Sequence, residues 1–119
     1  MLIKDCVKGW SSTVNFIDSN DNFVGFDDDH QCCEQFGWYF SRVPGVEDGT
    51  QDEASVGYVW DVQTPPYYPD NYGDSECACV SFRAVSTAGE VLWLTLYNSH
   101  DGCYSHGWEA PFLNKGGSI

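Results

Sequence analysis

Positive charge is scarce in this chain of 119 residues, in which five Lys and Arg stand against eighteen Asp and Glu and the formal net charge is −13. Phosphate contacts need a surplus of cations, so the composition argues against direct binding of nucleic acid. The imbalance is concentrated in residues 9–82, where fourteen acids accompany one cation, Arg42. Such a surface either keeps the protein in solution or faces a basic partner, and the composition leaves both interpretations open.

Long apolar runs are missing as well. No stretch approaches the roughly 18 apolar residues of a membrane span, and the segment from Met1 to Lys8 lacks the apolar core of a signal peptide. We therefore expect the protein to remain in the cytoplasm. The length suits a single domain over residues 1–119, with a flexible tail from about residue 114 to residue 119.

Helical periodicity is nearly absent, although the chain is rich in rings, with five Trp, seven Tyr and seven Phe. Its apolar residues stand in short segments rich in Val, Thr and aromatic residues and separated by Gly, Pro, Asn and Asp, which is typical of strands. We predict strands at about 12–17, 22–27, 37–43, 55–63, 77–87, 90–97 and 108–113. The expected fold is mostly β, or α+β with one or two short helices, built as a single antiparallel sheet or a small sandwich.

Turn residues predict two hairpins and one long loop. The segment Asp18-Ser19-Asn20-Asp21 is expected to join the first two strands, and Thr87-Ala88-Gly89 the fifth and sixth. The sixth strand is so apolar that it should lie centrally, with both faces covered. Residues 64–76 contain three Pro and three Tyr, and because Pro lacks a donor for the ladder we expect a surface loop there.

The six cysteines form no familiar metal or redox motif. No Cys-x-x-Cys pair occurs, and without an export signal we expect reduced thiols buried in the core and histidines on the surface. The alternative is a zinc site, because the chain offers more soft ligands than zinc requires. The candidate ligands are His30, Cys32, Cys33, Cys77 and Cys79, with His100, Cys103 and His106 near the end of the chain.

Motifs of the common enzyme classes are absent too. The chain has no nucleophile elbow, no phosphate-binding Gly-Lys-Ser/Thr loop, no His-Glu-x-x-His pair and no dinucleotide fingerprint. We therefore predict a protein that is not an enzyme and binds no cofactor. A small enzyme is the alternative, acting through paired carboxylates or through Cys33, which has His30 and Glu34 close by in the sequence.

Two short motifs carry a family resemblance, His30-Gln31-Cys32-Cys33-Glu34 and Asn98-Ser99-His100-Asp101-Gly102-Cys103-Tyr104-Ser105. From about Asp5 to Glu109 the chain resembles a family of small uncharacterised bacteriophage and prophage proteins, marked by Cys-Cys-Glu and by a later Asn-Gly-Tyr-Tyr-Ser-like motif. Residues 32–34, 102, 104 and 105 match this pattern, whereas Cys103 stands where Tyr is usual. The resemblance implies a viral origin and action in the bacterial host cytoplasm, and it brings no established activity.

Size, acidity and resemblance together favour a binding protein that inhibits a host system, as anti-CRISPR and anti-restriction proteins do. We predict that an acidic face binds a basic surface of a host nucleic-acid-handling or defence protein, with tyrosines as anchors. The candidate partner-binding residues are Glu47, Asp48, Asp52, Glu53, Tyr67, Tyr68, Asp70, Tyr72, Asp74 and Glu76. The alternatives are the small enzyme and a phage structural or assembly protein whose charge serves solubility alone.

Overall fold

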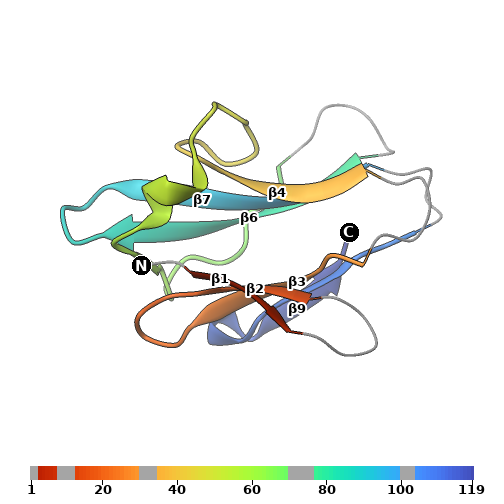
Figure 1. Cartoon of the computed structure of the whole chain (residues 1–119), viewed down its shortest axis with the longest axis horizontal. Helices are drawn as coiled ribbons and strands as arrows, with labels where there is room; N and C mark the ends of the chain where they lie inside the picture. Colours follow the sequence, from red (N-terminus) through yellow and green to blue (C-terminus); the bar gives the residue numbers. More distant parts are fainter. Residues whose placement is uncertain (1–2, 8–12, 30–34, 70–76, 100–103) are drawn as a thin grey trace.

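The computed structural model describes residues 3–7, 13–29, 35–69, 77–99 and 104–119, and the structural statements below concern these residues. Their regular structure is almost entirely strand, arranged in two antiparallel sheets that face each other (Figure 1). The helices among them are two short 3₁₀ turns. The prediction of a mostly β fold is therefore confirmed, in its sandwich form.

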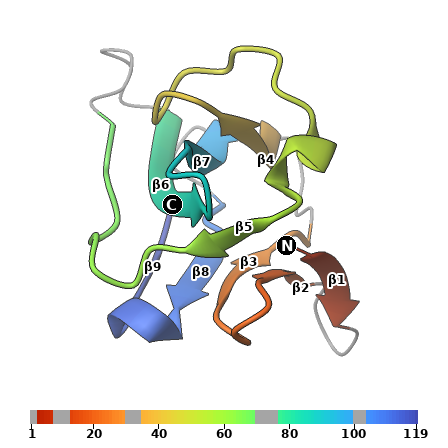
Figure 2. The ribbon, with the colours of Figure 1, turned by 90° about the vertical axis from the view of Figure 1, so that its left-hand side faces the viewer.

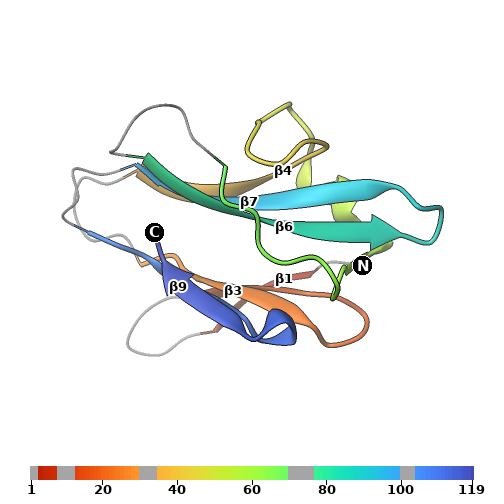
Figure 3. The ribbon, with the colours of Figure 1, turned by 180° about the vertical axis from the view of Figure 1, so that it is seen from behind.

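One sheet has five strands, in the order β1 (Ile3–Val7), β2 (Thr13–Ile17), β3 (Phe23–Asp27), β8 (Gly107–Ala110) and β9 (Lys115–Ser118). The other has four, in the order β4 (Gln35–Ser41), β7 (Val91–Ser99), β6 (Cys77–Ser86) and β5 (Tyr58–Trp60). The 3₁₀ helices are η1 (Asp52–Ser55) and η2 (Pro111–Leu113). The five-stranded sheet thus combines strands from the two ends of the sequence, and the middle of the chain builds the other sheet (Figure 3).

The core lies between the two sheets. Successive side chains of a strand point to opposite faces, so every second residue of the central strands turns inward. These inward side chains form one apolar cluster across both sheets. Its completely buried members are Val14, Val24, Phe26, Val80, Leu92, Leu94, Leu96 and Ala110.

Strand β5 ties the sheets together at one side of the sandwich (Figure 2). The backbone N–H of Trp60 donates to Asp18 Oδ2 at 2.8 Å, and the indole N–H donates to the Phe16 carbonyl at 2.9 Å. Asp18 Oδ1 accepts the backbone N–H groups of Asn20 and Asn22, which closes the turn between β2 and β3. This hairpin was predicted from its turn residues and is confirmed.

The second predicted hairpin, between β6 and β7, is also confirmed. Gly89 has a φ of +83°, a conformation that suits glycine in a tight turn. Strand β7 lies between β4 and β6, as expected for a central strand. On its outward face Thr95 is completely buried, whereas Trp93 and Tyr97 are half-buried.

Several strand boundaries differ from the prediction. The strand expected at 55–63 is limited to Tyr58–Trp60, since η1 and Gly57, with a φ of +89°, precede it. The strand expected at 108–113 ends at Ala110, because Pro111 cannot donate to the ladder. Within the expected loop at 64–76, Tyr67 exchanges two main-chain hydrogen bonds with Ser81, at 2.8 and 2.7 Å.

The strands at the two ends of the described chain, β1 and β9, both belong to the five-stranded sheet. Neither strand was predicted from the sequence. The sequence predicts a flexible tail at 114–119, and the structure corrects this expectation: β9 pairs with β8 along its whole length. Ile119 is buried and exchanges two main-chain hydrogen bonds with His106. At the other end β1 pairs with β2 in register from Ile3 to Val7.

Candidate partner-binding surface

Four of the predicted acidic residues, Glu47, Asp48, Asp52 and Glu53, lie on the loop of residues 42–57 that joins β4 to β5, and all four are exposed. The Asp48 carboxylate organises this loop. It accepts the backbone N–H of residue 42 at 2.9 Å, and both the N–H and the hydroxyl of Thr50. These hydrogen bonds lower the pKa of Asp48 and keep its carboxylate ionised, and the hydrogen bond from residue 42 has the largest effect.

A second loop, residues 61–69, meets the first at Gly45 and Pro69. Gly45 has a φ of +77°, and a Cβ placed on it would lie 2.7 Å from the Pro69 ring, so only glycine fits. Its N–H donates to Thr95 Oγ1 at 3.3 Å, and that oxygen lies 2.7 Å from Ser81 Oγ. The two loops are therefore joined over the outer face of the four-stranded sheet.

The predicted tyrosine anchors point to different surfaces. Tyr67 is 47% exposed and its ring centroid lies 6.1 Å from that of Trp93, on the outer face of the four-stranded sheet. Tyr68 is 58% exposed and lies 6.5 Å from Trp108, which belongs to the other sheet. The remaining predicted partner-binding residues lie outside the described residues: Asp70, Tyr72, Asp74 and Glu76.

Two cations, Arg42 and Arg83, lie beside this surface. The Arg42 guanidinium donates to the Tyr58 hydroxyl at 2.8 Å, a bond that raises the pKa of Arg42, and the Arg83 guanidinium pairs with the Asp61 carboxylate. Lys115 lies in the other sheet. Among the described residues, no hydrogen bond or ion pair engages the carboxylates of Glu47, Asp52 and Glu53.

A hollow of about 300 Å³ lies beside these carboxylates, at the free edge of β4. Trp38 and Tyr39, neighbours that point to opposite faces of the strand, both line it, and Glu47, Asp52 and Glu53 line its loop side. We call it the β4-edge hollow. The alternation within the predicted strand 37–43 could have placed Tyr39 on the outer face, but nothing in the sequence shows that the acidic loop returns to this edge.

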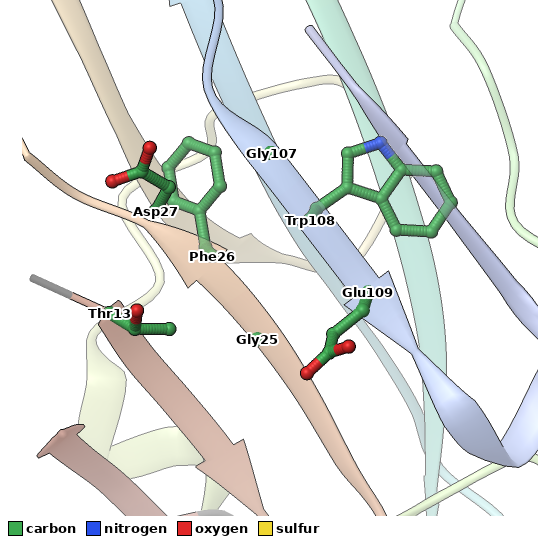
Figure 4. A pocket seen from close by; sticks show the side chains of 7 residues that line it. All are labelled: Thr13, Gly25, Phe26, Asp27, Gly107, Trp108 and Glu109. Carbon is green, nitrogen blue, oxygen red and sulfur yellow. The ribbon is translucent and has the colours of Figure 1, made fainter. Parts of the chain in front are cut away.

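A second hollow, of about 250 Å³, lies on the outer face of the five-stranded sheet (Figure 4). Gly25 of β3 and Gly107 of β8 leave its floor without side chains. The carboxylates of Asp27 and Glu109 stand beside them, while the two rings that border it belong to the buried core. In this hollow, two carboxylates therefore stand beside backbone that no side chain covers.

The structure describes only some of the residues that the sequence offers as a reactive thiol or as zinc ligands. His30, Cys32, Cys33, Glu34, His100 and Cys103, and the side chain of Cys77, lie outside the described residues. Cys79 is buried, as expected for a core thiol. In the part of the chain that the structure describes, no three His, Cys, Asp or Glu side chains gather as they would around a metal ion.

The expectation of a surface histidine is wrong for His106. Its ring is completely buried and stacks on Phe36, with the ring centroids 4.1 Å apart. Its Nδ1 lies 2.6 Å from the carbonyl oxygen of Asp27, which makes Nδ1 the protonated nitrogen. This histidine therefore anchors the start of β8 to the end of β3.

Asn98 opens the second motif of the family resemblance and has a structural role. It is completely buried, and its Nδ2 donates to the carbonyl oxygens of Tyr104 and Ile119, at 2.9 and 3.0 Å. The end of β7 is thereby joined to the segments that flank β8 and β9. This link closes the end of the sandwich away from Trp60.

The architecture is an antiparallel β-sandwich, a class of fold that hosts many unrelated functions. Comparison with protein-family models, with curated proteins and with solved structures finds no match to this chain. Within the described residues, no helix has the length and apolarity needed to cross a membrane. Function therefore has to be argued from the surface itself.

Proposed function

We propose that this chain is a stoichiometric binding protein of bacteriophage origin that acts in the bacterial host cytoplasm. Its proposed partner is a host protein with a basic surface, the nucleic-acid channel of a defence or replication enzyme. Binding would inhibit that enzyme by competition, because carboxylates take the place of phosphates on Arg and Lys side chains. The protein itself would bind no nucleic acid.

One observation supports this proposal above the others. The acidic loop 42–57 and the loop that carries Tyr67 meet at Gly45 and Pro69, so that exposed carboxylates and an exposed ring share one side of the molecule. Interfaces are typically anchored by aromatic residues within a polar rim. The cations nearby, Arg42 and Arg83, are held by Tyr58 and Asp61. Arg83 is thus paired with Asp61 and Arg42 lies close to Asp48, so the carboxylates of Glu47, Asp52 and Glu53 are the negative charges left for an external partner.

The proposal is tested by affinity capture from bacterial lysate across a salt series. We expect a nucleic-acid-binding protein to be retained at low salt and released as salt rises, because counterions screen a charge-driven complex. Added DNA should compete with the protein for the captured enzyme. Capture that is unchanged by rising salt and by added DNA would contradict the proposal.

Charge reversal provides the residue-level test. Glu47→Lys/Glu53→Lys should slow association with the captured enzyme about tenfold or more, because rim charges act mainly on the association rate. A matched pair of single variants is Glu53→Lys and Glu109→Lys, of which the second reverses one exposed glutamate on the outer face of the other sheet. Equal effects of the two variants would show that only net charge matters. Catalytic turnover of a substrate, or assembly into phage particles, would instead favour the enzyme or the structural alternative.

A further inference from the structure

The free edge of β9 presents main-chain hydrogen-bonding groups to solvent. Ile119 exchanges both main-chain hydrogen bonds with His106, and in an antiparallel ladder such pairs alternate with pairs that exchange none. Counted back from Ile119, the N–H and carbonyl groups of Gly116 and Ser118 therefore point away from β8. None of the described strands lies on that side, and every residue of β9 is exposed (Figure 3).

The four-stranded sheet, in contrast, has both of its edges covered. At the edge of β5 the N–H of Trp60 donates to the Asp18 carboxylate. At the edge of β4 lies the acidic loop with η1. Proteins commonly protect sheet edges by such cover, and an edge without it is a template for a further strand. Strand β9 has no cover of this kind, and its sequence contains two glycines and no carboxylate.

The Trp108 indole lies on the inner side of the β9 edge. A Cβ placed on Gly117 would lie 3.3 Å from Nε1 of this indole, so the ring lies directly over the bare backbone of β9 (Figure 4). Trp108 is 6% exposed, yet its indole N–H has no hydrogen-bond partner among the described residues. Beside it lies the exposed ring of Tyr68. The edge thus carries a buried donor without an acceptor and an exposed ring, and an added strand would cover both.

We propose that the chain forms a dimer in which the β9 strands of two copies pair antiparallel across a two-fold axis at Gly117. In this register Gly116 of each copy faces Ser118 of the other, and each such pair exchanges both main-chain hydrogen bonds. The edge is therefore complementary to itself, as a two-fold interface requires. The five-stranded sheets of the two copies then form one continuous sheet.

The glycine at the axis favours a second copy over a foreign strand. Opposite residues that exchange no hydrogen bonds have Cα atoms only about 4.5 Å apart, so a side chain facing Gly117 would compete with the Trp108 indole for space. A second Gly117 brings no side chain, which leaves room for the indoles of both copies over the glycines. Charge agrees with this choice, because two chains of net charge −13 then meet along strands that contain no acid.

This inference goes beyond the proposed function, because β9 and the acidic loop belong to different sheets. The two also differ in how they respond to salt. Salt screens the repulsion between two copies of charge −13 and so strengthens the dimer, whereas it weakens the capture of a basic partner.

The test measures the oligomeric state of the full chain by analytical ultracentrifugation over a range of protein and NaCl concentrations. We expect a monomer–dimer equilibrium whose dimer fraction rises with NaCl. Amide hydrogen exchange then locates the interface. In dilute protein the amides of Gly117 and Ile119 should exchange slowly and those of Gly116 and Ser118 fast, and in concentrated protein Gly116 and Ser118 should exchange about tenfold more slowly or less.

The variant Ser118→Pro removes one N–H group that faces the second copy. Edge strands accept proline where its missing N–H faces solvent, so we expect the monomer to keep its melting temperature while dimerisation weakens about tenfold or more. The matched control is Ser118→Ala, which keeps the N–H group and should dimerise like the wild type. The exchange pattern of the wild type tests the pairing even if Ser118→Pro does not fold.

A protein that stays monomeric at the highest protein and salt concentrations would overturn the inference, as would equal dimerisation of the two Ser118 variants. Protection of residues 3–7 in place of β9 would assign the dimer to the other edge of the sheet and also overturn it. Protection of β9 only after a host protein is added would show that a foreign strand occupies the edge. If the dimer forms as expected but no basic host protein is captured, the proposed function fails and the dimer stands.

Discussion

At the scale of single residues, Asp18 carries an unusual number of contacts. Its two carboxylate oxygens accept N–H groups from Asn20, from Asn22 and, in the other sheet, from Trp60. Asp18→Asn keeps the shape but turns one acceptor into a donor that faces an N–H group. We expect the free energy of unfolding, measured with urea, to fall by about 2 kcal/mol. Asp21→Asn, exposed in the same turn, should cost less than about 0.5 kcal/mol.

Asp61 is a second residue whose ionisation matters for stability. Burial acts to raise its pKa, but hydrogen bonds from the Thr64 hydroxyl, the Gln63 N–H and the Arg83 guanidinium outweigh burial and lower the pKa of Asp61 below its ordinary 3.8. A carboxyl group whose pKa is lower in the folded state stabilises that state above its unfolded pKa. This stabilisation is lost as the pH falls through the folded pKa.

The lowered pKa of Asp61 predicts how the stability of the variant Asp61→Asn depends on pH. The variant should be less stable than the wild type, by a difference that is constant from neutral pH to about pH 5 and shrinks at lower pH. Urea unfolding of both proteins over this range measures the difference. Thr64→Val, which removes one of the hydrogen bonds to Asp61, should lower stability by a smaller amount, and this loss should also shrink as the pH falls. A difference that persists to the most acidic pH at which both proteins fold would contradict this role.

At the scale of elements, the junction of the two loops depends on one glycine. Gly45→Ala forces an unfavourable φ and also brings a methyl group against Pro69. Gly49→Ala forces the same kind of φ, +83°, but meets no atom within 4 Å. We expect Gly49→Ala to cost about 1 kcal/mol of unfolding free energy and Gly45→Ala clearly more. Association with the captured enzyme should also weaken in Gly45→Ala, because this variant displaces the acidic loop.

Strand β9 yields a prediction that separates a paired strand from a loose tail. The N–H of Ile119 donates to the His106 carbonyl at 2.9 Å, and the Ile119 side chain is 8% exposed. Its amide hydrogen should therefore exchange slowly with solvent, and Ile119→Ala should lower the free energy of unfolding by about 2 kcal/mol. Fast exchange together with an unchanged stability would show that the pairing with β8 does not persist in solution.

The elements predicted from the sequence are those that local chemistry determines. The turn Asp18–Asp21 and the turn at Gly89 mark the hairpins β2–β3 and β6–β7, and alternation marks their inward faces. Strand β9 could not be predicted, because Lys115-Gly116-Gly117-Ser118 has little intrinsic preference for a strand. Its conformation comes from pairing with β8, and β-propensity depends strongly on such context.

At the scale of the whole molecule, the net charge of −13 sets a prediction for salt. Like charges repel one another in the compact state, and added salt screens them over a length of about 10 Å at 0.1 M. We expect the melting temperature to rise by a few degrees as NaCl is added at neutral pH. Glu47→Gln/Glu53→Gln, with two negative charges removed, should show a weaker dependence. A melting temperature that falls with salt would indicate that ion pairs such as Arg83–Asp61 dominate instead.

The candidate site was predictable in its composition and not in its arrangement. The density of carboxylates from Glu47 to Glu53 and the exposed Tyr67 can be read from the sequence. Their joining through Gly45 and Pro69 depends on the long-range path of two loops, and so does the approach of the acidic loop to Tyr39. Such contacts are set by the packing of the sheets and leave no local pattern.

The five-stranded sheet has a consequence for how the protein is made. Its strands β3 and β8 pair Gly25 with Glu109, residues from opposite ends of the sequence, and β9 adds to β8. During synthesis the hairpin β6–β7 can form as soon as it leaves the ribosome, but the part of its apolar face that Trp108 covers, at Phe82, stays open until β8 emerges. Folding dominated by such distant pairing is slow. The nascent chain therefore passes through a stage with exposed core surface, when its high negative charge hinders aggregation.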